Sequence, residues 1–352
     1  MIHFVHISSG PGGIEVLLPS IASELGASAF RAFVLRPPTP GLPNVYEGTG
    51  MPVCYGSKRN LPAFWALWRY ARRYRHDLFQ VFNIGPYNLL MLRLAGVKKI
   101  IYSIHGTIYW KKRREKWLRK IAWRLAKIPG MIFTANSQYS KAVFVQKVLP
   151  DTELYLLYNP IDAKRFCPSA ALTPEAEKGL HIIYAGRLAR GKNLFRWLDV
   201  AAAIAEKVPG CRFTLYGEGA LRAQLEAYAV ERGLGKQVCF AGHVEDVAAA
   251  YRAADILLFL SEYESFGNVV VESILSGTPV IASNIPSMRE IFEGYPEFLV
   301  KLDENLEASV LAKLAELPKL KALAEAARHA FAARFNIEKH VAALNQLYEH
   351  FS

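Results

Sequence analysis

Cysteine is scarce in this chain: its 352 residues contain four, Cys54, Cys167, Cys211 and Cys239, and none of them has C-x-x-C spacing. A structural zinc site or a disulfide framework therefore has no support, and a reducing compartment such as the cytoplasm fits best. Long apolar runs are also lacking, since no stretch reaches the 18 residues that suggest a membrane-spanning helix. The first seven residues, MIHFVHI, have no basic stretch before them, so we expect a buried first strand rather than a signal sequence.

Acidic residues are few in the first half of the chain. Residues 1–160 contain 22 Lys and Arg against 7 Asp and Glu, a net charge of +15, whereas residues 161–352 contain 21 against 24, a net charge of −3. All the excess positive charge of the protein therefore lies in the first half. This asymmetry indicates an anionic partner for that half.

Short β-rich runs alternate with helical stretches, which predicts parallel sheets wrapped by helices. At this length two domains are expected, and the pattern breaks at the Asn-Pro-Ile-Asp sequence of residues 159–162 before it restarts. We predict an α/β protein with two doubly wound, Rossmann-like units and a ligand site at the carboxyl ends of the strands. The predicted strands are 3–7, 32–35, 78–82, 99–103, 131–135, 153–157, 181–185, 212–216, 237–241, 256–259 and 280–282; the predicted helices include 14–24, 63–73, 114–125, 221–229, 268–275 and one from residue 194.

The most specific segment is residues 261–286, SEYESFGNVVVESILSGTPVIASNIP. Glu264 lies in the loop after a predicted strand, and Glu272 lies eight positions later in a predicted helix. The amides at the start of that helix suit a phosphate, because a helix N-terminus carries a partial positive charge. The two glutamates would repel a phosphate in direct contact, so they suit neutral hydroxyl groups on either side of it.

This segment resembles the E-x7-E signature of family 4 retaining glycosyltransferases, including the trailing Gly-Thr-Pro-Val. The resemblance implies the GT-B fold, in which two Rossmann-like domains face each other across a cleft. It also implies that Glu264 contacts the donor hexose and that Glu272 binds the ribose hydroxyls. The residues after Glu264 would hold the sugar and the phosphate: Ser265, Phe266, Gly267 and Asn268.

Two cations follow the strand at 181–185, in the sequence AGRLARGKN. Arg187 and Lys192 could neutralise a diphosphate as charge builds on it, because fixed cations stabilise developing negative charge. The family uses the corresponding G-R-L stretch for this purpose.

Glycines near the N-terminus, in the sequence SGPGGIE, join the first strand to a helix. Glycine lets backbone approach a phosphate closely. The dinucleotide fingerprint would need a glycine where Glu15 stands, so an NAD site is excluded. The G-G-x-E form instead resembles the family loop that covers the donor, which implies that Gly12 and Gly13 bind it.

His105 follows a predicted strand and precedes Gly106. A lone histidine is more often a core residue, but this position resembles that of the family histidine bordering the reacting sugar. The resemblance therefore implies a catalytic role for His105 through contact with the donor sugar, rather than as a general base. Weaker resemblances implicate Gly217 and Glu218 in nucleotide contact, and His243 and Val244 in contact with the base.

A basic and aromatic segment, residues 109–127, carries nine basic residues against one acidic residue. Apolar residues recur in it at helical spacing, which favours a helix lying on an anionic membrane surface. Residues 63–75 repeat this composition. The alternatives are an ordinary packed helix with solvated charges, or a nucleic-acid surface, which we do not expect because no recognised module is present. The predicted acceptor or membrane residues are Trp110, Lys111, Lys112, Arg113, Arg114, Trp117, Arg119 and Lys120.

The resemblance implies a retaining hexosyltransferase that moves a hexose or N-acetylhexosamine from a nucleotide-diphosphate sugar, with UDP expected from family frequency. The acceptor would be a glycan or a lipid-linked glycan in cell-surface polysaccharide biosynthesis, and neither a metal ion nor another cofactor is expected. Residues 1–160 would bind the acceptor, with helix 337–352 packed on them, and residues 161–336 would bind the donor. We expect a cytoplasmic protein, peripheral at the inner face of the cell membrane. A nucleotide-sugar epimerase and a non-catalytic binding protein remain as alternatives.

Overall fold

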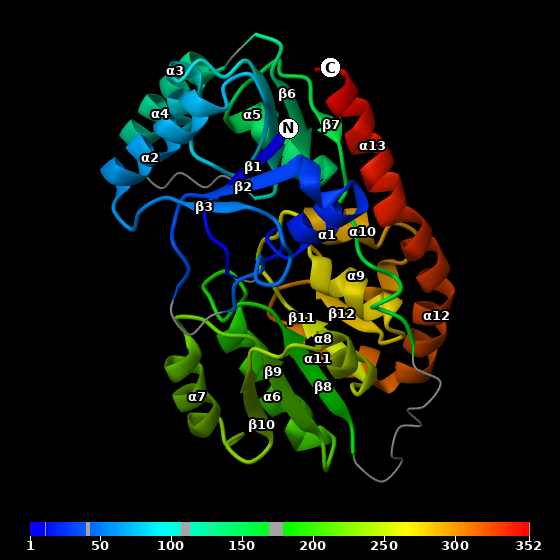
Figure 1. The fold of residues 1–352 in the computed structure, drawn as a ribbon. Helices are drawn as coiled ribbons and strands as arrows, with labels where there is room; N and C mark the ends of the chain where they lie inside the picture. The colour runs from blue at the N-terminus through cyan, green and yellow to red at the C-terminus, as the bar shows by residue number, and fades with distance from the viewer. Residues whose placement is uncertain (11, 40–42, 107–112, 128, 169–178, 352) are drawn as a thin grey trace. The chain divides into compact units, whose positions relative to one another are not determined.

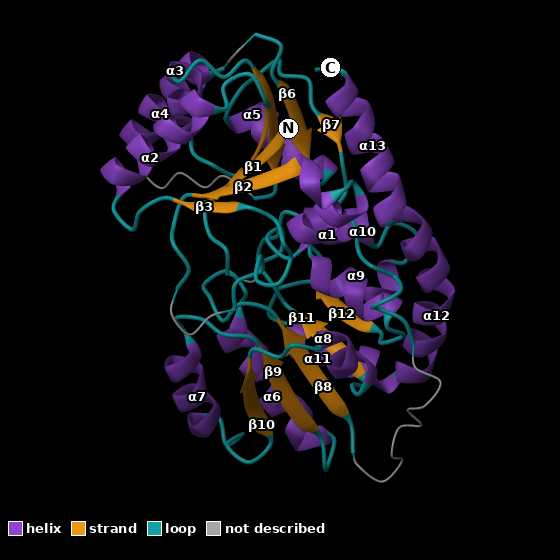
Figure 2. Ribbon diagram, viewed as in Figure 1, coloured by secondary structure: helices purple, strands orange, loops and turns teal. Residues whose placement is uncertain are grey.

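The structure, a computed structural model, describes residues 1–10, 12–39, 43–106, 113–127, 129–168 and 179–351. It divides into two compact units, one formed by residues 1–160 with 337–352 and the other by residues 161–336. Each unit contains one parallel sheet with helices packed against it (Figures 1 and 2). The predicted α/β class with two Rossmann-like units is confirmed.

The first unit has a seven-stranded sheet in the order β3-β2-β1-β4-β5-β6-β7. Its central strands β4 and β5 are almost completely buried, as expected for parallel strands that are covered on both faces. The elements are β1 (Ile2–His6), α1 (Leu17–Glu24), β2 (Phe30–Val34), β3 (Val53–Tyr55), α2 (Asn60–Arg73), β4 (Leu78–Phe82), α3 (Pro86–Leu94), β5 (Lys99–Ile104), α4 (Arg113–Ala126), β6 (Ile132–Ala135), α5 (Gln138–Lys147), β7 (Tyr155–Leu156) and α13 (Ile337–Glu349).

Two apolar clusters cover the faces of this sheet. One contains side chains from α2, α3, α4 and α5, and the other contains side chains from α1 and α13. The last helix, α13, thus belongs to the first unit although the chain reaches it from the second. Leu344 and Tyr348 of α13 are buried in the second cluster, and the Tyr348 hydroxyl donates a hydrogen bond to Gln80 Oε1 on β4.

The second unit has a six-stranded parallel sheet in the order β10-β9-β8-β11-β12-β13. Its elements are β8 (His181–Ala185), α6 (Leu194–Lys207), β9 (Arg212–Tyr216), α7 (Arg222–Glu231), β10 (Val238–Gly242), α8 (Val247–Arg252), β11 (Ile256–Phe259), α9 (Asn268–Leu275), β12 (Val280–Ser283), α10 (Pro286–Ile291), β13 (Leu299–Val300), α11 (Leu306–Ala315) and α12 (Leu317–Arg334).

Several boundaries differ from the predicted ones. The helix predicted from residue 14 begins at Leu17, because residues 13–16 form turns instead. Helix α2 begins at Asn60 rather than at residue 63; Pro62 lies in its first turn, where an amide has no helical acceptor in any case. The predicted strand 153–157 is reduced to Tyr155–Leu156 at the edge of the sheet. Strands β3 and β13 were not predicted, and no bounds were predicted for helices α3, α5, α8, α10, α11 and α12.

The four cysteines are free, and three of them are exposed. In the described ranges, no helix is both long enough and apolar enough to cross a membrane.

The Tyr348–Gln80 hydrogen bond yields a first prediction. Tyr348→Phe should lower the free energy of unfolding by about 1–3 kcal/mol, because Gln80 would keep a buried oxygen without this donor. Urea unfolding followed by circular dichroism measures the change. Tyr87→Phe is the matched control, since Tyr87 is 46% exposed and should tolerate the change; equal effects of the two substitutions would contradict the assignment of α13 to the core of this unit.

Candidate active site

The second sheet reverses its strand order next to β8. From β8 the chain proceeds to β9 and β10 on one side, and then returns to place β11 on the other side of β8. The loops that follow β8 and β11 therefore leave the same edge of the sheet and diverge. In open parallel sheets this reversal is where ligands bind. Here the first loop carries Arg187 and Lys192, and the second carries Glu264.

An ion pair joins these two loops. Lys192 Nζ contacts Glu264 Oε1, and the side chains are 25% and 13% exposed, respectively. The ammonium group also lies 5.7 Å from the centroid of the Phe259 ring at the end of β11, within the range of a cation–π contact. The sequence placed these residues 72 positions apart, and the reversal of the sheet brings them together.

The backbones of the two loops are also in close contact. The Glu262 amide donates a hydrogen bond to the Gly191 carbonyl at 2.9 Å. Gly191 has a φ of +87°, and a Cβ atom on it would lie 2.3 Å from the ring of Tyr263. Glycine is therefore required beside Lys192 for two reasons, the left-handed backbone and the packing of the aromatic ring.

Arg187 lies on the same loop as Lys192 but is exposed. Its carbonyl accepts a hydrogen bond from the buried Tyr184 hydroxyl at 3.1 Å. Burial and the nearby Glu264 raise the pKa of Tyr184, whereas Arg187 opposes this effect, so both charged groups lie near the same phenol. Arg187 thus shares a loop with Lys192, and Lys192 makes the ion contact with Glu264.

Helix α9 begins four residues after Glu264. Its N-cap, Gly267, has a φ of +121°, and a Cβ atom there would lie 2.6 Å from Met288 Cε. Phe266 is buried and packs edge to face against Phe335, with ring centroids 5.4 Å apart. The predicted helix 268–275 is confirmed. Its N-terminus, which carries the partial positive charge of the helix dipole, begins at the buried Asn268, three residues after Ser265.

Glu272 lies on α9 and is held by Tyr251 of α8. The Tyr251 hydroxyl donates to Glu272 Oε2 at 2.9 Å. Burial raises the pKa of Glu272 to about 7, although the hydrogen bond from Tyr251 and the charge of Arg165 partly oppose this shift. A buried carboxylate destabilises the fold when it is ionised. Its presence here therefore favours a functional role for Glu272.

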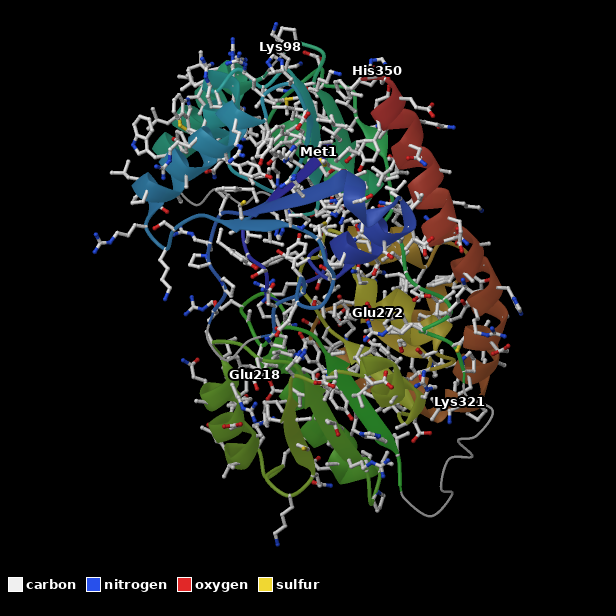
Figure 3. All side chains as sticks on the ribbon, viewed as in Figure 1. Met1, Lys98, Glu218, Glu272, Lys321 and His350 are labelled. Carbon is white, nitrogen blue, oxygen red and sulfur yellow. The ribbon has the colours of Figure 1, made fainter. Side chains whose placement is uncertain are left out.

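The turns after β9 and β10 approach each other closely. The Gly217 amide donates to the Gly242 carbonyl at 2.7 Å, and a Cβ on Gly217 would lie 2.0 Å from the Gly186 carbonyl oxygen. Glu218 forms an ion pair with Arg222, which also donates to the Phe240 carbonyl at 2.8 Å. Figure 3 labels Glu218, in the turn after β9, and Glu272, on α9. His243 is exposed and Val244 is half-buried directly after β10.

In the first unit, the glycine-rich loop follows β1. A Cβ on Gly12 would lie 2.3 Å from Glu15 Oε2, so the carboxylate of Glu15 lies against this glycine. Gly13 is exposed. Burial raises the pKa of Tyr46, and the charge of Glu15 adds to this shift; the Tyr46 hydroxyl is 2.6 Å from His6 Nε2.

His105 lies at the carboxyl end of β5. Its amide donates to Asn83 Oδ1 at 2.8 Å, and its Nδ1 lies 3.0 Å from Asn159 Oδ1. Because an amide oxygen only accepts, Nδ1 carries the hydrogen and Nε2 is the acceptor nitrogen. Burial, with a smaller effect of His340 on α13, lowers the pKa of His105 to about 3. The ring is therefore neutral at physiological pH.

The predicted membrane segment is described only in part. Trp110, Lys111 and Lys112 lie outside the described residues, and α4 includes Arg113, Arg114, Trp117 and Arg119 in its backbone. Lys120 is half-buried. The apolar residues of α4 divide between the core and the surface: Ala122 and Trp123 are buried, whereas Leu118 and Leu125 are 44% and 56% exposed. The helical period turns Trp123 toward the sheet.

Helix α2 exposes a second amphipathic stripe. Leu61 and Trp65 are 72% and 62% exposed, and Arg69, Arg72 and Arg73 follow on exposed positions. The spacing of Leu61, Trp65, Arg69 and Arg72 places them along one side of the helix.

Tyr251, Tyr184 and Arg222 were missed by sequence reasoning. Tyr251 reaches Glu272 from another helix, 21 positions away, and no spacing along the chain signals that contact. Tyr184 and Arg222 contact Arg187 and Glu218 at the local spacings i,i+3 and i,i+4, which the sequence could have indicated. Among the described side chains, no group of three or more His, Cys, Asp or Glu residues could hold a metal ion.

Comparisons with known proteins match both halves of the chain to glycosyltransferases. The family model for glycosyl transferases group 1 matches residues 171–330, and that for glycosyltransferase family 4 matches residues 11–165. The UDP-Gal:alpha-D-GlcNAc-diphosphoundecaprenol alpha-1,3-galactosyltransferase of Escherichia coli is 22% identical over 312 residues, 82% of this chain and 79% of that protein. The Vi polysaccharide biosynthesis protein VipC/TviE of Salmonella typhi is 25% identical over 238 residues, 63% of this chain but 41% of that protein.

Among solved structures, Anabaena HepE in complex with UDP-glucose has a TM-score of 0.83 to this chain. The two are 20% identical, and the match covers 98% of each chain. This likeness confirms the predicted GT-B fold class.

The raised pKa of Glu272 yields a second prediction. Ionisation is disfavoured in the folded protein, so the free energy of unfolding should fall as pH rises from about 4.5 to about 7, and stay lowered above that. Glu272→Gln should remove this pH dependence. The change in the free energy of unfolding that the substitution causes should therefore be about 1–3 kcal/mol more favourable at pH 8 than at pH 4.

Urea unfolding of both proteins at the two pH values measures this difference. Glu231→Gln, an equal change of charge at an exposed position, is the control. A Glu272→Gln protein with the same pH dependence as the wild type would show that this carboxylate is not held in an unfavourable environment.

Proposed function

Because the chain belongs to the glycosyl transferases group 1, we propose that it moves a hexose or N-acetylhexosamine from a nucleotide-diphosphate sugar. The donor that we propose is a UDP-sugar. The acceptor in this proposal is a glycan or lipid-linked glycan of cell-surface polysaccharide biosynthesis. The transfer retains the anomeric configuration and needs no metal ion or other cofactor.

One observation carries the proposal: Lys192 and Glu264 form an ion pair at the strand reversal, with Arg187 on the loop of Lys192 and the start of α9 four residues after Glu264. A diphosphate needs cations and amide donors, which Arg187, Lys192 and α9 supply. A sugar needs acceptors for its hydroxyl groups, which Glu264 supplies. Glu272, with one oxygen held by Tyr251, suits the neighbouring pair of ribose hydroxyls. Gly217, Glu218, His243 and Val244 are assigned to the nucleotide, and Gly12 and Gly13 to the donor phosphate and sugar.

In the reaction, the bond between the anomeric carbon and the diphosphate oxygen breaks as the acceptor oxygen attacks from the same face. The acceptor proton passes to an oxygen of the departing diphosphate. Arg187 and Lys192 stabilise the charge that develops on this leaving group. We nominate no carboxylate as a covalent nucleophile. His105, neutral and with Nε2 as an acceptor, is assigned to contact with the transferred sugar.

The first unit is assigned to the acceptor and to an anionic membrane surface. Residues 1–160 of this unit carry a net charge of +15, and α2 exposes Leu61 and Trp65 beside three arginines. An apolar face flanked by basic residues is the pattern of a helix that lies in the membrane interface. The Escherichia coli relative acts on a diphosphoundecaprenol-linked sugar, which supports a lipid-linked acceptor. The protein would then be cytoplasmic and peripheral at the inner face of the cell membrane, with no nucleic-acid partner.

The donor is tested first by thermal shift with UDP, GDP and ADP, because a ligand that binds the native state raises its stability. Release of UDP from a panel of UDP-hexoses and UDP-N-acetylhexosamines, with polyprenyl-diphosphate-linked sugars as acceptors and EDTA present, then tests transfer. Lys192→Gln should lower kcat by about 10²–10³-fold, because a preorganised charge on the leaving group is lost.

Lys207→Gln, at the exposed last turn of α6, is the control and should leave kcat unchanged. NMR of the product's anomeric proton reports retention or inversion. Conversion of the free donor into its isomer would support an epimerase instead. The absence of any nucleotide binding, together with the absence of transfer, would overturn the proposal.

Membrane association is tested by flotation with vesicles of phosphatidylglycerol and phosphatidylcholine and with vesicles of phosphatidylcholine alone. The wild type should bind the anionic vesicles, less so at high salt. Replacing both Leu61 and Trp65 by Ala should weaken binding by at least about tenfold, because their apolar surface no longer enters the interface. Val230→Ala, 68% exposed on α7, is the control. Equal lack of binding to both vesicles would remove this part of the proposal.

A further inference from the structure

The Lys192–Glu264 ion pair joins two groups whose proposed ligands differ. Lys192 is assigned to the diphosphate and Glu264 to the sugar, yet in this structure each is the charged partner of the other. The Lys192 ammonium group has three hydrogens to donate. When it is placed for its best contact with the Glu264 carboxylate, however, it is not placed for its best contact with a bound phosphate. A diphosphate that binds Lys192 therefore competes with Glu264.

The low exposure of Glu264 makes the loss of Lys192 unfavourable. Glu264 is 13% exposed, so water replaces a lost cation poorly, and a largely buried carboxylate without its partner is unfavourable. The two loops cannot easily separate, because Glu262 donates to the Gly191 carbonyl and Tyr263 packs against Gly191. Glu264 must then find a new partner close to its present position.

We propose that Glu264 makes the site select the intact donor over the free nucleoside diphosphate by competing for Lys192. An intact donor brings sugar hydroxyls that donate to Glu264 and replace the lost ammonium group. A free nucleoside diphosphate draws Lys192 away and offers Glu264 no donor in return. The pair thus weakens binding of the product more than binding of the substrate, and favours product release. This inference rests on the proposed function, since it requires a nucleotide-sugar donor.

A double-mutant cycle on UDP binding tests the inference by isothermal titration calorimetry. Glu264→Gln keeps the shape of the side chain and removes its charge, so UDP should bind about three- to tenfold more tightly than to the wild type. Lys192→Gln should weaken UDP binding. In the Lys192→Gln background, adding Glu264→Gln should change UDP affinity by less than about 1.5-fold, because no ammonium group remains to compete for.

Two controls separate this mechanism from simple charge repulsion. Glu262→Gln removes the same charge two residues away, at an exposed position, and should leave UDP affinity unchanged. Glu264→Ala repeats the cycle with a second variant, and thermal melting shows that each protein is folded. For the intact donor, Glu264→Gln should reduce the preference for UDP-glucose, UDP-galactose or UDP-N-acetylglucosamine over UDP.

The outcomes distinguish the two levels of the proposal. A wild type that binds none of UDP, GDP and ADP refutes the proposed function, and the inference with it. If the wild type prefers GDP or ADP, the same cycle is run with that nucleotide. A wild type that binds, with Glu264→Gln binding no more tightly, refutes the inference alone. If Glu264→Gln tightens UDP binding equally with Lys192 present and in the Lys192→Gln background, the inference is also refuted, because like-charge repulsion would then explain the effect.

Discussion

The ion pair between Lys192 and Glu264 depends on where the second sheet reverses its strand order. Strand β8 has β9 on one side and β11 on the other, so the loops after β8 and β11 leave the same edge and turn apart. The gap between diverging loops is where a parallel α/β sheet can admit a ligand without disturbing its core. Lys192 and Glu264 meet there, and the contacts of Gly191 with the loop after β11 hold their two loops together.

The loops at this edge of the second sheet pack with their backbones in close contact. Gly191 and Gly217 each lie where a Cβ atom would collide with a neighbouring loop, and both have positive φ. Side chains at these positions would push apart the turns that carry Arg187, Lys192 and Glu218. The glycines therefore set the spacing of the charged groups, although they bear no charge themselves.

Electrostatics in the two units is arranged in opposite ways. In the first, burial keeps His105 neutral, and Asn159 selects which ring nitrogen carries the hydrogen. In the second, Glu272 is retained where burial raises its pKa to about 7, with Tyr251 supporting the ionised form. A neutral acceptor and a carboxylate poised near neutrality both suit recognition of hydroxyl groups, because neither requires a compensating charge on the ligand.

The amino-acid sequence by itself determined the class of fold and named most of the residues that we assign to the candidate site. Strands β4, β8, β9 and β11 and helix α9 begin and end where the apolar runs and glycine-containing turns predicted, because buried parallel strands leave a strong local signal. Short edge strands such as β3 and helices with weak periodicity such as α5 left no such signal, since tertiary packing rather than local pattern stabilises them.

Tertiary structure alone decided which residues act on one another. The pairing of Lys192 with Glu264, the hydrogen bond from Tyr251 to Glu272 and the return of α13 to the first unit each join residues distant in sequence. Such contacts follow from the order in which strands pair, and residue types along the chain do not encode that order locally. The sequence could therefore name the charged groups, whereas only the fold could show that two of them form an ion pair.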